Sequence, residues 1–228
     1  PKDMPRNRIV YGAPGTGKSF RLNEESKKYF DSDKKERITF HPGYSFQQFV
    51  GAYKPTPIYK DFDSSSYKLY DADNLTELPK TKQKEPIINY SFIAGSFLKM
   101  LIAATNDKNN NYLLLIEEIN RANVSSVFGA VFQLLDRDDT GESEYSVEFN
   151  SDITTYLRSE GIDQPNRIKI PSNLYIWSTM NNADQGVLPL DSAFKRRWSF
   201  EYTGINDSEE KVKDYIINMK GKCYNWNT

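Results

Sequence analysis

The chain has 228 residues, of which 38% are hydrophobic and 27% charged, so it is long enough for one sizeable α/β domain. Its formal net charge of -1 argues against binding nucleic acid through bulk charge, and its single cysteine excludes an intramolecular disulfide framework and a cysteine-based zinc site. Because no apolar run approaches the roughly 18 residues of a membrane span and the N-terminus lacks a signal sequence, we expect a cytoplasmic protein with no membrane part.

The first predicted elements, a strand at residues 8–11 and a helix at 20–30, flank the sequence Gly-Ala-Pro-Gly-Thr-Gly-Lys-Ser at 12–19. This sequence matches Gly-x4-Gly-Lys-Ser/Thr, the phosphate-binding P-loop, whose backbone N–H groups and following helix N-terminus attract an anion. A glycine-rich surface turn without a ligand is the alternative, and the flanking strand and helix disfavour it. We therefore expect a nucleoside triphosphate to contact Gly12, Ala13, Pro14, Gly15, Thr16, Gly17, Lys18, Ser19 and Phe20.

The next part of the chain combines predicted elements with a polar insertion. A strand is expected at 36–40, followed by a short helix over about 46–53 whose aromatic residues have near-helical spacing and favour core packing. Residues 54–90 are polar and interrupted by prolines, which predicts a surface insertion with room for a hairpin. The apolar positions of residues 96–104 fit one face of a helix.

A continuous apolar run at residues 112–116 is typical of a central parallel strand buried on both faces. The acid pair Glu117-Glu118 follows it directly. Asn123 is the expected N-cap of a helix whose apolar face extends to Leu135. A second polar insertion is expected at 136–167.

The remaining predicted elements are a strand at 174–180, a helix at 190–197, a strand at 198–202 and a final helix at 207–220. Alternation of strands and helices after a P-loop predicts an α/β fold with a doubly wound, mainly parallel sheet. Ligands of such sheets bind at the carboxyl ends of the strands. The P-loop, the two acids and Asn181 are all predicted at that edge, so three polar features converge on one crevice.

This convergence predicts the chemistry of phosphoryl transfer. Lys18 is expected to reach the β- and γ-phosphates, and the Ser19 hydroxyl to hold Mg²⁺. Glu117 is expected to bind Mg²⁺ directly or through a water, whereas Glu118 orients or deprotonates the attacking water. An acid pair at a strand end can also be mere solvated charge, but the preceding apolar strand and the upstream P-loop favour the functional interpretation.

Four further residues are candidates for hydrolysis. Asn181 can donate its amide to the γ-phosphate or to the lytic water, with a simple turn-former as the alternative, and Asp184 can orient that amide or a partner residue. Arg196 and Arg197 end a predicted helix, where cations favour the dipole. Their functional interpretation is an arginine finger acting on a neighbouring subunit, which requires head-to-tail contacts that close into a ring.

Together, these motifs resemble those of an AAA+ NTPase, and more closely the McrB type, the GTP-dependent motor subunit of methyl-directed restriction systems. The most specific marks are Glu-Ile-Asn-Arg-Ala-Asn at 118–123 and Met-Asn-Asn-Ala-Asp at 180–184. Further marks include Val-Phe-Gly at 127–129 and Phe-His at 40–41. The resemblance covers roughly residues 8 to 203, interrupted by both insertions.

The resemblance implies a three-layer αβα sandwich with a five-stranded sheet at residues 1–205 and the start of a helical lid at 206–228. It implies a hexameric ring that hydrolyses GTP with Mg²⁺, is stimulated by a McrC-like nuclease subunit and drives translocation along DNA carrying modified bases. On the same basis, Glu118 corresponds to the catalytic acid, and Asn181 and Asp184 to the signature element of the family.

The sequence also departs from the McrB pattern. Glu117 stands where the family usually has Asp, so the carboxylate is displaced by a methylene, and Asn182 and Gln185 replace the usual Thr and Arg. Two alternatives to a GTPase therefore stay open: an ATP-hydrolysing AAA+ remodelling protein of the MoxR or dynein-related kind, and a nucleotide-gated scaffold with negligible turnover. The complete set of catalytic candidates argues against the scaffold, because a degenerate site would have lost some of them.

Overall fold

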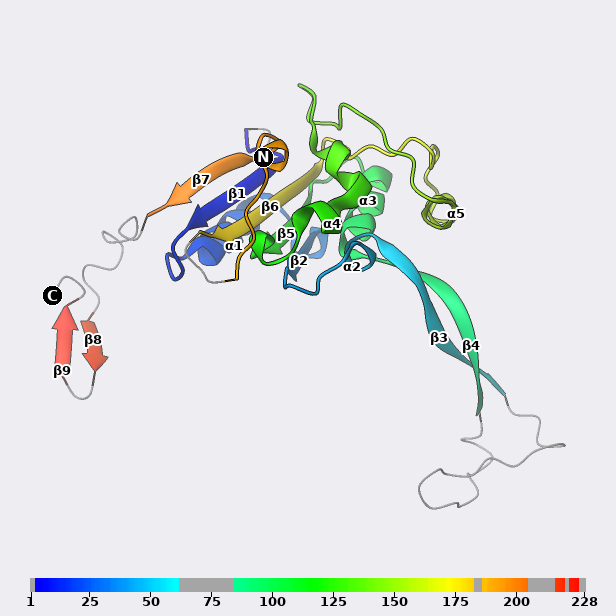
Figure 1. The fold of residues 1–228 in the computed structure, drawn as a ribbon, viewed down its shortest axis with the longest axis horizontal. Helices are drawn as coiled ribbons and strands as arrows, with labels where there is room; N and C mark the ends of the chain where they lie inside the picture. The colour runs from blue at the N-terminus through cyan, green and yellow to red at the C-terminus, as the bar shows by residue number, and fades with distance from the viewer. Residues whose placement is uncertain (1–2, 62–83, 183–185, 205–215, 220–221, 226–228) are drawn as a thin grey trace, which may run out of the picture.

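The computed structural model describes residues 3–61, 84–182, 186–204, 216–219 and 222–225. Its centre is a five-stranded sheet in the order β2-β5-β6-β1-β7, in which every pairing of neighbours is parallel (Figure 1). This arrangement confirms the mainly parallel five-stranded sheet expected from the sequence. The strands are β1 Asn7–Gly12, β2 Lys35–Thr39, β5 Tyr112–Glu117, β6 Leu174–Asn181 and β7 Ser199–Thr203.

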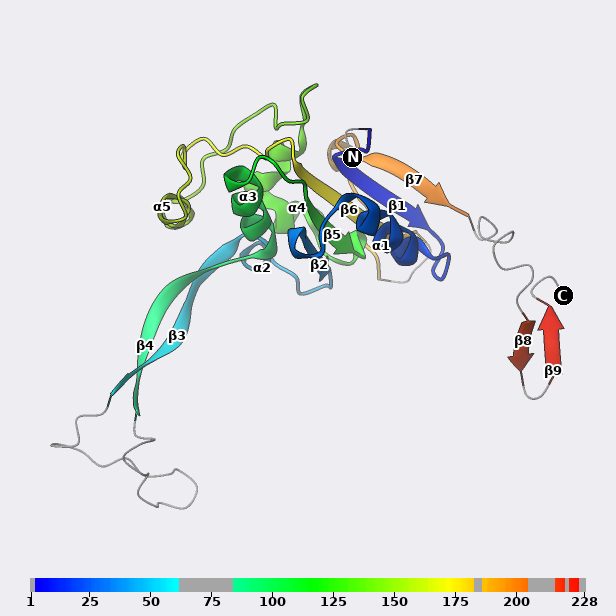
Figure 2. The same cartoon turned by 180° about the vertical axis from the view of Figure 1, so that it is seen from behind.

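Helices cover both faces of this sheet, as the opposite views of Figures 1 and 2 show. No helix in the described part of the chain is both long and apolar enough to cross a membrane. Short 3₁₀ helices lie at Ser32–Lys34, Ile119–Arg121 and Gly129–Leu135. The α-helices are α1 Lys18–Tyr29, α2 Phe46–Phe49, α3 Ser96–Asn106, α4 Val124–Phe128, α5 Ser151–Ser159 and α6 Ser192–Lys195.

The central strand β5 shows how the layers are held together. All six of its residues are buried, and successive side chains point to opposite faces of the sheet. Leu113 and Leu115 pack with Leu22 of α1 on one face. Leu114 and Ile116 lie on the other face, in the larger core that also contains α3 and α4. The result is the three-layer αβα sandwich implied by the resemblance.

The helix expected to run to Leu135 is divided at Gly129. Its N-cap is Asn123, as predicted, since this side chain accepts a hydrogen bond from the backbone N–H of Ser126. The α-helix ends before Gly129, which has φ 49°, and the chain continues as a 3₁₀ helix. A Cβ at Gly129 would lie 3.0 Å from the ring of Phe46, so the break lets α2 and α4 pack closely.

The first insertion contains a two-stranded antiparallel ribbon that extends away from the sheet (Figure 1), formed by β3 Gly51–Asp61 and β4 Lys84–Ala94. The hairpin for which the sequence left room is therefore present, with residues 62–83 outside the described ranges. Tyr53, expected on the preceding helix, lies on β3 because Gly51, at φ 141°, turns the chain out of α2. Large apolar side chains are exposed along the ribbon, namely Tyr53, Ile58, Ile87, Ile88, Tyr90 and Ile93.

The second insertion, expected to be polar at 136–167, is partly built into the core. Helix α5 buries Ile153 and Leu157, which are four residues apart and therefore on one face. Tyr156 of the same helix packs against Phe92 of β4, with ring centroids 4.8 Å apart. Helix α5 thus supports the base of the ribbon.

The helix expected over 207–220 is wrong for the part that the structure describes. Ile216–Met219 forms β8, which pairs antiparallel with β9, Lys222–Asn225. Adjacent β-branched isoleucines in β8 favour a strand over a continued helix. Residues 205–215 lie outside the described ranges, so the lid expected at 206–228 stays a prediction.

Candidate functional site

The P-loop connects β1 to α1 at the carboxyl edge of the sheet. Gly15 and Gly17 have φ values of 80° and 79°, a left-handed backbone that favours glycine. Gly12 meets a different constraint, because a Cβ there would lie 2.3 Å from the backbone oxygen of Thr203 on β7. Since Lys18 begins α1, the loop directs backbone N–H groups and a helix N-terminus toward the same space.

Lys18 is buried and folds back over the P-loop. Its Nζ donates hydrogen bonds to the carbonyl oxygens of Ala13, at 2.6 Å, and Gly12, at 3.2 Å. The long stem and the three donors of a lysine allow these carbonyls to be exchanged for phosphate oxygens. An open hollow of about 610 Å³ lies in front of the loop, and Phe20, Glu118 and Asn181 help to line it.

Glu117, at the end of β5, is buried and accepts hydrogen bonds on both carboxylate oxygens. Its Oε2 accepts from the hydroxyl groups of Ser19, at 2.7 Å, and Thr179, at 2.5 Å. Its Oε1 accepts from Nη2 of Arg37 at 2.6 Å. The two residues expected to hold Mg²⁺, Ser19 and Glu117, are therefore in direct contact.

The chemistry of this donor set fits Mg²⁺. A hydroxyl and a carboxylate are hard oxygen ligands, and Mg²⁺ at nucleotide sites completes its octahedron with phosphate oxygens and water. Within the described ranges, no group of three or more His, Cys, Asp or Glu residues could hold a metal ion. A cation held by Ser19 and Glu117 would therefore be shared with the phosphates of a nucleotide.

Glu118 and Asn181 form a second pair at the same edge. Nδ2 of Asn181 lies 2.7 and 2.8 Å from the two carboxylate oxygens of Glu118. Glu118 has φ 58°, the one positive φ among the described non-glycine residues, and such a conformation costs about 1 kcal/mol or more. This backbone separates the two acids: Glu117 contacts Ser19 beneath the loop, whereas Glu118 lines the hollow.

Asn120 is a site residue that the sequence reasoning missed. Its buried Nδ2 donates to the backbone oxygen of Asn181 at 2.7 Å, and its own backbone oxygen accepts from the N–H of Leu188 at 2.8 Å. The first bond fixes the end of β6, and the second joins Asn120 to the segment that follows this strand. A signal was available, because Asn120 belongs to the Glu-Ile-Asn-Arg-Ala-Asn run, but no role was derived for it. Asp184 lies outside the described residues, so its role stays a prediction.

The two candidate finger arginines lie at the opposite edge of the sheet. They precede β7, which runs parallel to β1 and meets the P-loop only at its other end, where Thr203 pairs with Gly12. Nε and Nη2 of Arg197 donate to Asp136 at 3.0 and 2.7 Å, and its guanidinium lies over the ring of Phe132. Arg196 is exposed. Neither arginine is brought to the hollow of its own chain.

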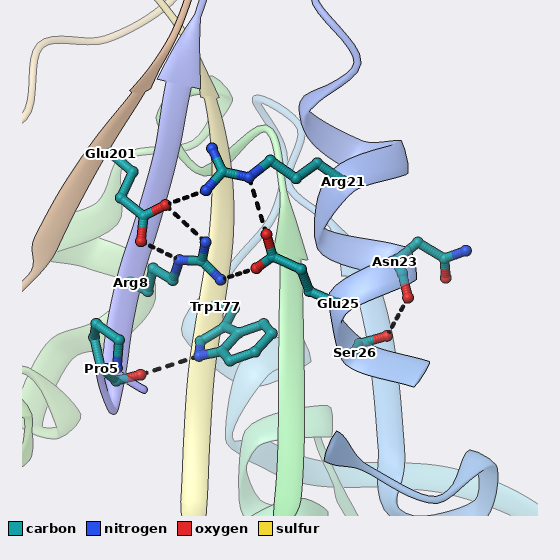
Figure 3. A network of polar contacts seen from close by, with 8 residues as sticks. All are labelled: Pro5, Arg8, Arg21, Asn23, Glu25, Ser26, Trp177 and Glu201. Carbon is teal, nitrogen blue, oxygen red and sulfur yellow. Dashed lines mark hydrogen bonds and ion pairs between the residues drawn. The ribbon is translucent and has the colours of Figure 1, made fainter. Parts of the chain in front are cut away.

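A network of charged side chains fixes α1, the helix that follows the P-loop (Figure 3). Arg8 of β1, which is 1% exposed, donates to Glu25 of α1 and to Glu201 of β7. Arg21 of α1 donates to the same two carboxylates, and the Arg8 guanidinium lies over the ring of Trp177. Burial alone would lower the pKa of Arg8, but the two carboxylates outweigh burial and raise it. The network therefore ties α1 to the strands on which the P-loop depends.

Comparison with known proteins agrees with the geometry of the site. The model of the AAA domain family (dynein-related subfamily) matches residues 7–198. The type II restriction enzyme BsuMI component YdiS of Bacillus subtilis (strain 168) is 50% identical over 232 residues, covering 99% of this chain and 66% of that protein. The type IV methyl-directed restriction enzyme EcoKMcrB subunit of Escherichia coli (strain K12) is 26% identical over 222 residues, covering 96% of this chain and 40% of that protein.

The chain thus spans 66% and 40% of the lengths of these two relatives. The description of the family model includes the dynein-related subfamily, which the sequence left open as an alternative. Both relatives, however, are restriction proteins, and this supports the McrB-type resemblance. A solved structure from Cytophaga hutchinsonii, described as a candidate ATPase, matches with a TM-score of 0.44 and 16% identity over 90% of this chain and 44% of that one. A likeness of that degree is too weak to support a conclusion.

Proposed function

Because the chain belongs to the AAA domain family (dynein-related subfamily) and is an AAA+ P-loop NTPase domain of the McrB type, we propose that it is a Mg²⁺-dependent GTPase. In this proposal it is the motor module of a modification-dependent DNA restriction complex. The observation that carries the hydrolytic part is the convergence of Lys18, the Ser19–Glu117 contact and the Asn181–Glu118 pair at one edge of the sheet. The choice of GTP over ATP rests on the McrB-type resemblance.

In the proposed reaction each contact at this edge has a use. Lys18 exchanges its loop carbonyls for phosphate oxygens, and Ser19 and Glu117 hold Mg²⁺, which when bound neutralises phosphate charge. Glu118 orients the attacking water or accepts its proton. Asn181 keeps the Glu118 carboxylate turned toward the hollow, so a direct contact of this amide with the γ-phosphate requires that the pair first separates.

We expect a second copy of the chain to complete the site, within the hexameric ring that the McrB-type resemblance implies. Strand β7 has five residues at about 3.3 Å each, so Arg196 lies roughly 16 Å or more from the P-loop edge of its own sheet. An arginine finger at the amino edge of the sheet therefore acts on the nucleotide of a neighbouring subunit. We assign that role to the exposed Arg196, because Arg197 is engaged by Asp136 within its own chain.

The partners proposed for this module also follow from the McrB-type resemblance. They are a McrC-like nuclease subunit, which stimulates hydrolysis, and DNA, which is contacted through the assembled complex. Both relatives are longer than the region that they share with this chain. Recognition of the modified DNA can therefore lie in parts of the protein or of the assembly outside these residues.

The proposal is tested by turnover with GTP, ATP, CTP and UTP, measured as phosphate release in the presence of the nuclease subunit. We expect GTP to be hydrolysed fastest, and Glu118→Gln to lower turnover with every nucleotide by about 10²-fold or more. A higher rate with ATP would overturn the GTP assignment and favour an ATP-using remodelling protein. Equal, negligible rates for the wild type and Glu118→Gln in the assembled complex would instead favour a nucleotide-gated scaffold.

A further inference from the structure

Glu117 has a cationic neighbour that the proposed reaction does not use. Arg37 lies on β2, and its Nη2 donates to Oε1 of Glu117 at 2.6 Å. The contact depends on strand register: Thr39 pairs with Glu117, and Arg37, two residues earlier, points to the same face of the sheet. The Arg37 side chain is 52% exposed and that of Glu117 is 8% exposed, so a cation at the rim reaches a buried carboxylate.

The donors around Glu117 divide its two oxygens between them. Oε2 accepts from the hydroxyl groups of Ser19 and Thr179, whereas Oε1 accepts from the charged guanidinium of Arg37. Hydroxyl groups carry no net charge, whereas the guanidinium of Arg37 places a positive charge 2.6 Å from Oε1. A divalent cation held by Ser19 and Glu117 would therefore share one carboxylate with a second cation, and the two cations repel each other.

The identity of the acid strengthens this interpretation. Ser19 lies on α1 and Arg37 on β2, so the Glu117 carboxylate spans from one element to the other. An aspartate at this position would be one methylene shorter, and its carboxylate would lie closer to the β5 backbone. The longer side chain of the glutamate thus carries its carboxylate away from β5, where Ser19 and Arg37 both contact it.

We propose that Arg37 is a positioning residue that clamps Glu117 and raises the Mg²⁺ concentration required at the nucleotide site. The cation then binds together with the triphosphate, whose negative charge offsets the guanidinium, rather than before it. This inference rests on the proposed function, because it requires that the P-loop binds a Mg²⁺–nucleotide complex.

The inference is tested by measuring the affinity of imido analogues of GTP and ATP by calorimetry over a series of free Mg²⁺ concentrations. The affinity for the analogue should rise with free Mg²⁺. In Arg37→Gln, the Mg²⁺ concentration at the midpoint of this rise should be about tenfold lower than in the wild type. Arg37→Lys keeps the charge and should stay near the wild type. Arg158→Gln removes an exposed arginine on α5 and serves as the matched control, with no expected shift.

The outcomes separate this inference from the proposed function. A wild type that binds an analogue, with an unchanged or higher Mg²⁺ requirement in Arg37→Gln, would overturn the role of Arg37 alone. A wild type that binds neither analogue at any Mg²⁺ concentration would overturn both. Circular dichroism checks that the variant is folded, and if Arg37→Gln does not fold, Arg37→Met replaces it with the same expected shift.

Discussion

The two edges of the parallel sheet hold the candidate catalytic acids and the candidate finger arginines in different surroundings. At the carboxyl edge, Glu117 and Glu118 are held by hydroxyl, amide and guanidinium donors beside an open hollow. At the amino edge, Arg197 is engaged by Asp136, while Arg196 beside it is exposed. Because every strand of the sheet is parallel, the acids and the arginines are separated by the length of a strand. On the proposed function, one chain therefore offers two halves of a hydrolytic site that meet only between copies.

Substitution of Arg196 has the largest expected effect and is the strongest test of the division of the site between the two edges. If this residue completes the site of a neighbour, Arg196→Ala should lower turnover of the assembled ring by about 10³-fold or more without lowering the melting temperature. Mixing Arg196→Ala with Lys18→Ala subunits should restore part of the phosphate release, since a mixed interface pairs an intact P-loop with an intact arginine. No recovery in mixed rings would contradict action on a neighbour.

At the carboxyl edge, Glu118→Gln should lower turnover by about 10²- to 10⁴-fold while nucleotide affinity is retained, because the amide cannot take a proton from water. Asn181→Ala should have the smaller effect of about tenfold, since on the proposed function this amide orients the Glu118 carboxylate. Phosphate release and analogue binding measure the two properties separately. Full turnover in Asn181→Ala would show that the pair is not used in the reaction.

Substitution of Arg197 is expected to change the stability of the fold, whereas substitution of Arg196 is expected to change turnover. Arg197→Ala removes two hydrogen bonds to Asp136 and the contact with the Phe132 ring, and should lower the free energy of unfolding by about 2 kcal/mol. Urea unfolding monitored by tryptophan fluorescence measures the loss. Arg196→Ala is the matched control, expected within about 0.5 kcal/mol of the wild type. Equal losses in the two variants would contradict the distinction drawn between these arginines.

The smallest expected effect concerns the network beneath the P-loop. Burial alone would raise the pKa of Glu25, but hydrogen bonds from Arg8 and Arg21 outweigh it and lower the pKa. A carboxylate with a lowered folded-state pKa contributes stability above its ordinary pKa, and this contribution is lost as the pH falls through the folded-state value. Glu25→Gln should therefore lower the unfolding free energy by about 1 kcal/mol near neutral pH.

The difference between Glu25→Gln and the wild type should shrink in acid, as urea unfolding at a series of pH values down to about pH 3 would show. A difference that is constant over this range would mean that packing, rather than charge, accounts for the loss. Glu24→Gln is a suitable control, because the Glu24 side chain is 45% exposed and pairs only with Lys27 among the described ion pairs.

Much of this fold could be predicted because its signals are local. The apolar run of β5 identifies a strand buried on both faces, and the P-loop pattern specifies a strand, a turn and a helix in that order. Since parallel strands end at one edge, the convergence of Glu118 and Asn181 followed without knowledge of strand order. Chain order and periodicity were sufficient for these features.

The features that were missed depend on contacts between distant segments. The contacts of Arg37 and Thr179 with Glu117 follow from the pairing of β2, β5 and β6, and no motif encodes that register. Gly129 divides a helix whose apolar periodicity continues across it, because Phe46 packs there from another element. The hairpin at β8 and β9 shows that periodicity alone cannot separate a short helix from two short strands.

The β3–β4 ribbon has a consequence for how this protein can vary. Its two ends are already joined, since the N–H of Gly95 donates to the backbone oxygen of Val50 at 2.8 Å, and both ends lie against α2. Each doubling in the length of a loop that is closed at its base costs only about 0.6 kcal/mol of additional closure entropy. The ribbon can therefore be lengthened, shortened or rewritten with little effect on the sheet beneath it, which makes it a suitable position for inserting new sequences into this domain.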